Sequence, residues 1–112
     1  MKILVAVDGS AYTKRMLAYL AAHEEWLGEL HDYTVVHVVP AVPPRAAAVL
    51  DKAVLKAYYD DEAEKVLKPI RNFMGKQGLK AEFLVKVGHA ADVIAASATK
   101  GKYDLLILGS RG

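Results

Sequence analysis

The chain has 112 residues, of which 54% are hydrophobic and 25% charged, a composition typical of one folded globular domain. Its 15 basic and 13 acidic residues give a formal net charge of +2 and are scattered along the chain, so neither nucleic acid nor an anionic membrane is indicated as a partner. Cysteine is absent, which excludes disulfides, thiolate metal sites and cysteine nucleophiles. Because no apolar stretch is long enough for a signal peptide core or a membrane span, we expect a cytoplasmic protein.

The amino-terminal 30 residues predict one strand followed by one helix. Residues 3–7, ILVAV, are continuously apolar, which is typical of a strand covered on both faces of a parallel sheet. The DGS that follows predicts a turn in which Ser10 caps the next helix. From Ala11 to about Trp26, apolar residues recur at helical spacing; they are Met16, Leu17, Leu20, Ala21 and Leu27.

A second strand is predicted over residues 33–39, YTVVHVV. This segment is rich in β-branched residues and ends at Pro40, which has no N–H group to donate to a neighbouring strand. Residues 40–49, PAVPPRAAAV, contain three prolines and are predicted to form a flexible connection.

A long helical pattern and a third strand come next. Apolar residues lie on one helical stripe from about Val49 to Met74, but Pro69 lies inside it and predicts a kink or break near residues 65–68. In residues 80–87, KAEFLVKV, apolar and polar side chains partly alternate, which indicates a strand with one wet face. We therefore expect this strand at an edge of the sheet.

The last part of the chain completes an alternating pattern. Residues 88–103 contain apolar positions at helical spacing, with Gly101 as a stop signal, and LLILG after Asp104 predicts another buried strand. The order β-α-β-α-β-α-β predicts a single α/β domain over residues 1–112. Its parallel sheet would have right-handed crossovers and helices on both faces, which gives a three-layer architecture.

Ligands of open α/β sheets bind outside the carboxyl ends of the strands. At the ends of the two most apolar strands, Asp8 offers a carboxylate, and Gly109 and Gly112 offer backbone N–H groups that could hold a phosphate. Taken alone, GSRG is more typical of a plain turn, and Asp8 could equally be a turn former. Because neither G-x-x-x-x-G-K-[ST] nor G-x-G-x-x-G occurs, a Walker-type NTPase is excluded.

The remaining polar residues do not predict catalysis. The chain's histidines share no metal-ligand spacing; His37 lies in a strand and is typical of a buried or hydrogen-bonded histidine, while His89 could face the same crevice as Asp8. The acidic run of residues 60–64 is typical of a solvated helix face. No G-x-S-x-G nucleophile motif is present, so acyl transfer has no support and no catalytic residue is predicted.

Four segments together resemble the universal stress protein family over the whole chain. They are KILVAVDGS at the amino end, VVHVVP after the second strand, VGHAADVIAASA after the third and YDLLILGSRG at the fourth. The resemblance implies a Rossmann-like, adenine nucleotide alpha hydrolase-like sheet with strand order 3-2-1-4-5. The fifth strand would be absent from this chain, and the implied order agrees with the edge position expected for the third strand.

The resemblance also implies a binding site. ATP-binding members carry G-x-x-G, nine residues and G-[ST] after the fourth strand; here Gly109 and Gly112 match its first half, with Ser110 and Arg111 between them. Adenine would pack beside Val38, with Asp8 near the adenosine and Ala6 on the same wall. The implied ligand is ATP, with Mg or Mn as a possible companion, and Asp8 is the single candidate near such a metal.

Family members continue through a fourth helix and a fifth strand that commonly pairs two subunits. The expectation is therefore that the chain is a truncated version of a longer protein that forms a homodimer. Three functions are compatible with the resemblance. The first is a binding protein that holds ATP as a regulatory ligand in stress response. The second is an interaction protein of the same fold without nucleotide. The third is a slow ATP hydrolase, for which no base besides Asp8 can be named.

Overall fold

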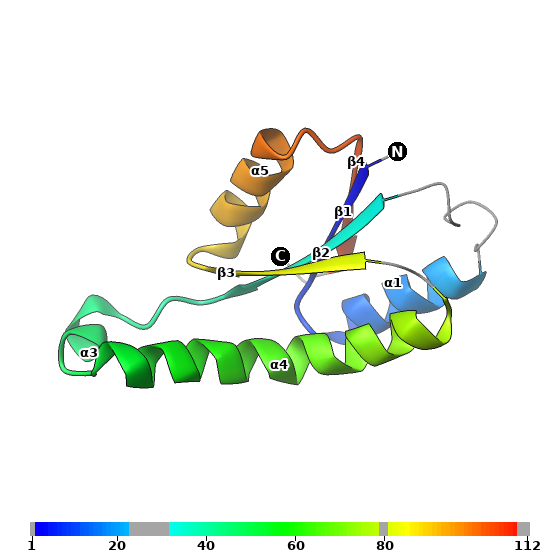
Figure 1. The fold of residues 1–112 in the computed structure, drawn as a ribbon. Coiled ribbons are helices and arrows are strands. Elements are labelled where there is room, and N and C mark those ends of the chain that lie inside the picture. Colours follow the sequence, from blue (N-terminus) through cyan, green and yellow to red (C-terminus); the bar gives the residue numbers. More distant parts are fainter. Residues whose placement is uncertain (1, 23–31, 79–80, 110–112) are drawn as a thin grey trace.

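The computed structural model describes residues 2–22, 32–78 and 81–109, and it contains an alternating series of strands and helices (Figure 1). In chain order the elements are β1 (Lys2–Val7), α1 (Ala11–Ala22), β2 (Asp32–Val39), α3 (Pro44–Ala48), α4 (Lys52–Lys76), β3 (Ala81–Val87), α5 (Ala90–Lys100) and β4 (Leu105–Gly109). In this described part of the chain, no helix is both long and apolar enough to cross a membrane.

The strands form one parallel sheet in the order β3-β2-β1-β4, which confirms the predicted order of the first four strands. The pairs Ile3–Tyr33 and Ile3–Leu105 set the registers of β1 with its two neighbours. The edge position predicted for the third strand is also confirmed. Because the chain crosses from one edge of the sheet to the other between β3 and β4, the strand order reverses beside β1.

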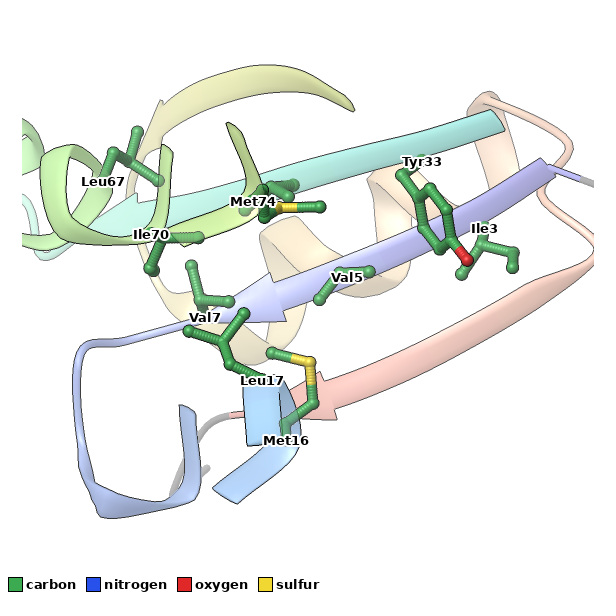
Figure 2. Packing of buried hydrophobic residues seen from close by; sticks show 10 residues of the cluster. Ile3, Val5, Val7, Met16, Leu17, Tyr33, Leu67, Ile70 and Met74 are labelled. Atoms are coloured by element: carbon green, nitrogen blue, oxygen red, sulfur yellow. The ribbon is translucent and has the colours of Figure 1, made fainter. Parts of the chain in front are cut away.

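Helices α1 and α4 cover one face of the sheet. Figure 2 shows Ile3, Val5 and Val7 of β1 directed toward these two helices. The buried side chains that meet them are Met16 and Leu17 of α1, Leu67, Ile70 and Met74 of α4, and Tyr33 and Val35 of β2. Alternate residues of β1 therefore serve this face, as the period of two in a strand requires.

Helix α5 lies on the opposite face (Figure 1). The residues of β1 and β2 that point this way, Leu4, Ala6, Val36 and Val38, are buried. Partly buried side chains of α5, including Val93 and Ile94, pack against them. The central strands β1 and β2 are thus covered on both faces, which explains their unbroken apolar sequences.

Of the kink or break predicted near residues 65–68, the break is wrong, because α4 continues through Pro69 from residue 52 to residue 76 (Figure 1). Pro69 is exposed, whereas Leu67 and Ile70 on either side of it are buried against the sheet. The carbonyl that loses its partner at a proline can bond to water on the solvent side, so packing of the apolar stripe outweighs the loss of one hydrogen bond.

One other segment differs from the sequence predictions. The proline-rich connection contains the short helix α3, which begins at Pro44 and continues through three alanines. Proline is well tolerated at the first position of a helix, where its missing N–H group has no intrahelical partner to lose. Helix α1 is described to Ala22, so the end predicted near Trp26 lies outside the described residues.

Candidate functional site

The carboxyl ends of β1 and β4 lie level with each other, and the neighbouring strand β2 continues two residues further. Val7, the last residue of β1, pairs with Gly109 of β4 on one side and with His37 of β2 on the other. Asp8 follows Val7 directly and therefore stands at the point where the strand order reverses. The structure thus brings Asp8 and Gly109 together at one edge of the sheet, where ligands of open α/β sheets bind.

The Asp8 carboxylate is held by the turn that it begins. Its Oδ1 accepts a hydrogen bond from the backbone N of Ser10 at 2.9 Å and from the hydroxyl of Thr13 at 3.2 Å. Ser10 Oγ in turn accepts from the backbone N of Tyr12 at 3.2 Å, which confirms Ser10 as the predicted cap of α1. Asp8 is therefore both a turn former and a partly exposed carboxylate at the strand ends.

Thr13 is a functional candidate that sequence reasoning missed. Its side chain lies in the first turn of α1 with 2% of its surface exposed. Thr13 Oγ1 accepts hydrogen bonds from the backbone N of Asp8 and of Gly9, each at 3.1 Å, in addition to donating to Asp8. The sequence offered one indication of this role: residue 13 lies at helical spacing from Met16 and Leu17, on the inward face of the helix, where a hydroxyl group needs hydrogen-bond partners.

Gly9 gives the turn its shape. Its φ of +79° lies in the left-handed region, which costs other residues energy. A Cβ atom at this position would also lie 3.3 Å from Cγ2 of Val66 in α4. The turn after β1 is therefore pressed against α4, and this contact helps to fix the position of Asp8.

His37 is buried two residues before the end of β2, as predicted for a hydrogen-bonded histidine in a strand. It is 7% exposed, and its Nδ1 lies 2.9 Å from the carbonyl oxygen of Val7. A carbonyl can only accept, so Nδ1 carries the proton in this contact. The bond ties β2 to the last peptide carbonyl before Asp8.

Ala6 and Val38 lie on the α5 face of the sheet, below the strand ends. Ala6 pairs with Val36 on one side and Leu108 on the other, and continuing this register by two residues brings Val38 beside Asp8. Ala6 is 0% exposed and Val38 is 8% exposed, because partly buried side chains of β3 and α5 pack against their cluster.

The predicted glycine loop is described only at its first residue. Gly109 ends β4, while Ser110, Arg111 and Gly112 lie outside the described residues. His89 stands before α5, where its exposed side chain lies 3.4 Å from the Asp92 carboxylate within the first turn. It belongs to the helix start rather than to the Asp8 turn.

Charges elsewhere are arranged as surface pairs. In α4, Glu62 pairs with Lys65 at 2.8 Å and Glu64 with Arg71 at 2.9 Å, in agreement with the solvated face predicted for the acidic run. The hydrogen bond from Arg71 lowers the pKa of Glu64. Among residues 2–22, 32–78 and 81–109, no group of three histidine or acidic side chains is placed to hold a metal ion.

Comparison with known proteins gives a consistent result. The model of the Universal stress protein family matches residues 1–112. The curated protein Universal stress protein Slr1230 of Synechocystis is 32% identical over 111 residues. The match includes 99% of this chain but 32% of that protein, so the chain spans about a third of the length of this relative.

Solved structures share the fold at lower identity. A universal stress protein family protein of Arabidopsis thaliana with AMP bound superimposes with a TM-score of 0.71 at 20% identity, covering 100% of this chain and 78% of that one. A universal stress protein in complex with cAMP gives a TM-score of 0.66 at 17% identity, covering 95% and 73% respectively. At these identities the likeness establishes the fold.

Proposed function

Because this chain belongs to the universal stress protein family, we propose that it binds an adenine nucleotide and holds ATP as a regulatory ligand in the response to stress. One observation carries the proposal: the Asp8 carboxylate, fixed by its turn, follows directly after the Val7–Gly109 pair, where the strand order reverses. A carboxylate can accept hydrogen bonds from a ribose or from the edge of a base. A neighbouring glycine has no side chain, so a phosphate chain can approach its backbone closely.

The residues around Asp8 fit an adenosine group. Ala6 and Val38 are small and apolar, which suits the face of an adenine ring, and the nearby Asp8 offers a polar acceptor. In this proposal Val38 contacts adenine, Asp8 binds the adenosine and Ala6 forms the wall beneath. The apolar side chains would select a flat ring by its shape, and hydrogen bonds to Asp8 would orient it.

The phosphates would be held on the β4 side. Around the start of α1, the backbone N–H groups of Asp8, Gly9, Ser10 and Tyr12 all donate to side chains of the same turn. These amides are therefore committed within the protein and do not form an anion site. We assign the phosphates to residues 109–112, and Asp8 remains the single candidate near a Mg or Mn ion that accompanies the nucleotide.

The related structures support the ligand class. One of these proteins carries AMP and another is a complex with cAMP, and both share an adenosine moiety with ATP. We propose ATP rather than a monophosphate because Gly109 and Gly112 match the first half of the phosphate motif implied by the family resemblance.

Calorimetry with ATP, AMP, cAMP and GTP tests the proposal. We expect saturable binding of adenine nucleotides, weaker binding of GTP, and an affinity for ATP reduced roughly tenfold or more by Asp8→Ala, since about 1.4 kcal/mol corresponds to a factor of ten. Asp51→Ala is the matched control, because Asp51 Oδ1 also caps a helix, accepting from the backbone N of Ala53 at 3.2 Å in α4. A folded protein that gives no saturable heat with any adenine nucleotide would contradict the proposal and favour a nucleotide-independent interaction protein.

We also propose that the protein is a cytoplasmic homodimer. In the described part of the chain β4 lies at an edge of the sheet, and Leu106 and Leu108 on its α5 face are 38% and 61% exposed. Apolar strand edges and faces of this kind are usually covered in native assemblies. Light scattering during size exclusion gives the oligomeric state, and a monomer at all concentrations would contradict this part of the proposal.

A further inference from the structure

The peptide unit between Val7 and Asp8 is held at both ends by side chains from different elements. Its carbonyl oxygen, on Val7, lies 2.9 Å from Nδ1 of His37 in β2. Its N–H group, on Asp8, donates to Oγ1 of Thr13 in α1 at 3.1 Å. The orientation of the backbone that carries the Asp8 side chain is thus set by two contacts rather than by the strand alone.

The two side chains that make these contacts are buried, which makes the contacts costly to break. Thr13 is 2% exposed and His37 is 7% exposed, so neither side chain could readily exchange its hydrogen bond for one to water. Rotation of the peptide would break both contacts, and to restore them His37 would have to change its tautomer and Thr13 would have to turn its hydroxyl proton away from Asp8. The two contacts together therefore favour the observed orientation.

Thr13 also controls the side chain of Asp8. The same Oγ1 that accepts from the backbone donates its own proton to Asp8 Oδ1 at 3.2 Å. With its third hydrogen bond, from Gly9 N, the hydroxyl uses one donor and two acceptor positions. One buried hydroxyl thereby couples the direction of the backbone to the direction of the carboxylate.

We propose that Thr13 and His37 are positioning residues for nucleotide binding: they hold the Val7–Asp8 peptide from both ends and aim the Asp8 carboxylate at the adenosine. The inference rests on the proposed function, since Asp8 is the residue through which both act. Neither side chain needs to contact the ligand. Preorganisation of this kind raises affinity because the cost of ordering the site is met during folding.

Close packing of the core does not require polar side chains at Thr13 and His37. Valine has nearly the shape of threonine, and leucine would fill most of the volume of His37 in a core that is otherwise apolar. Polar groups in such places are disfavoured unless their hydrogen bonds are made. Their contribution is therefore the direction that they impose on the Val7–Asp8 peptide.

Two matched pairs of variants separate shape from hydrogen bonding. Thr13→Val keeps the shape and removes the hydroxyl, while Thr13→Ser keeps the hydroxyl. His37→Leu removes the donor to the Val7 carbonyl, while His37→Asn retains a nitrogen donor near the position of Nδ1. If Thr13→Val does not fold, the His37 pair tests the other end of the same peptide.

The first readout does not depend on nucleotide. Amide hydrogen exchange followed by NMR should show the Asp8 and Gly9 N–H groups protected in the unmodified protein, because both donate to a buried oxygen. We expect exchange at these two amides to accelerate at least about tenfold in Thr13→Val and to remain slow in Thr13→Ser. Equal exchange in both variants would overturn the proposed contacts.

The second readout is the affinity for ATP. We expect Thr13→Val and His37→Leu each to weaken binding by roughly tenfold, and Thr13→Ser and His37→Asn to stay within about threefold of the unmodified protein. In an Asp8→Ala background the Thr13→Val change should have no further effect, because there is no carboxylate left to aim. Additive losses in that double variant would mean a general structural role and would overturn the inference.

The two hypotheses fail in different ways. Protected amides with no ATP binding by the unmodified protein would contradict the proposed function and, with it, the ligand assigned to the positioned carboxylate. ATP binding that is unaffected by Thr13→Val and His37→Leu would leave the proposed function standing and overturn the positioning role alone.

Discussion

The two ends of β1 are held by different kinds of contact. At the amino end, Lys2 and Asp104 exchange two hydrogen bonds: Lys2 N donates to Asp104 Oδ2, and Asp104 N donates to the carbonyl of Lys2, each at 2.8 Å. Lys2 Nζ also donates to the carbonyl of Gly101 at 2.7 Å. At the carboxyl end, the corresponding contacts come from the buried side chains of Thr13 and His37.

The exposed contacts between Lys2 and Asp104 form a structural tether, whereas the buried contacts at the carboxyl end hold the proposed binding residue Asp8 in place. Lys2 and Asp104 are exposed, so their hydrogen bonds compete with water and each contributes little to stability. Thr13 and His37 are shielded from water, so their hydrogen bonds fix one orientation at a larger cost of disruption. The rigid end of β1 is the end at which the strand order reverses, where a binding residue needs a defined direction.

The largest expected effect comes from removing the packing that supports the carboxyl end. Leu67 of α4 is 1% exposed and belongs to the cluster that contains Val7 (Figure 2). Leu67→Ala should lower the free energy of unfolding by about 3 kcal/mol, through lost apolar burial and the cavity that remains. Urea denaturation measures the change, with the exposed neighbour Lys68→Ala as control. A loss below about 1 kcal/mol would mean that α4 does not anchor this end.

The Gly9 turn gives the next largest effect. Gly9→Ala should cost about 2 to 3 kcal/mol, since the new Cβ atom meets both an unfavourable φ and Cγ2 of Val66 at 3.3 Å. Gly78→Ala is the matched control: its φ of +71° is similar, but no atom lies within 4 Å of the added Cβ. We expect about 1 to 2 kcal/mol there. Equal losses in urea denaturation would show that the contact with α4 does not restrain the turn.

Much of the fold was predictable because the sequence patterns report burial directly. The unbroken apolar run at 3–7 predicts the central strand β1, and the mixed pattern at 80–87 predicts the edge strand β3, as observed. The run after Asp104 predicts a buried strand, whereas among the described residues β4 lies at an edge with Leu106 and Leu108 exposed. Pro69 misled the prediction for α4 because local propensity takes no account of which face of the helix meets the sheet. Whether a proline breaks a helix depends on that tertiary contact.

The site was predictable in part. Asp8, Ser10 and Gly9 form a recognisable turn sequence, and the strand context places them at the correct edge of the sheet. Helical spacing places Thr13 on the inward face of α1, but its hydrogen-bond partners could not be read from the sequence, because they depend on how α1 lies against residues 8 and 9. The contact between His37 and Val7 likewise joins residues 30 positions apart, and no local pattern specifies such a contact.

At the amino end, Tyr33 of β2 offers a test by pH. It pairs with Ile3, and burial raises its pKa to about 12. In the unfolded chain the Tyr33 hydroxyl would lose its proton near pH 10, whereas in the folded protein it keeps the proton until about pH 12. The free energy of unfolding is therefore highest below pH 10 and falls as the pH rises toward 12. We expect a loss of roughly 2 kcal/mol over that interval, measured by urea denaturation. Tyr33→Phe should lack this component, and identical pH profiles for the two proteins would contradict the assignment.

The smallest effect should come from the exposed tether itself. Asp104→Ala removes the acceptor of the Lys2 backbone N–H group but leaves the Asp104 N–H group bonded to the Lys2 carbonyl. Because water can replace the lost acceptor, we expect the free energy of unfolding to fall by about 0.5 to 1 kcal/mol.

The same change should leave ATP affinity within about twofold of the unmodified protein, since Asp104 stands at the opposite end of the sheet from Asp8. Calorimetry and urea denaturation of one preparation give both values. If Asp104→Ala weakened ATP binding as strongly as Thr13→Val, the orientation of Asp8 would depend on the contacts at both ends of β1. The two ends of the strand would then differ in the burial of their contacts but not in the effect of those contacts on ATP binding.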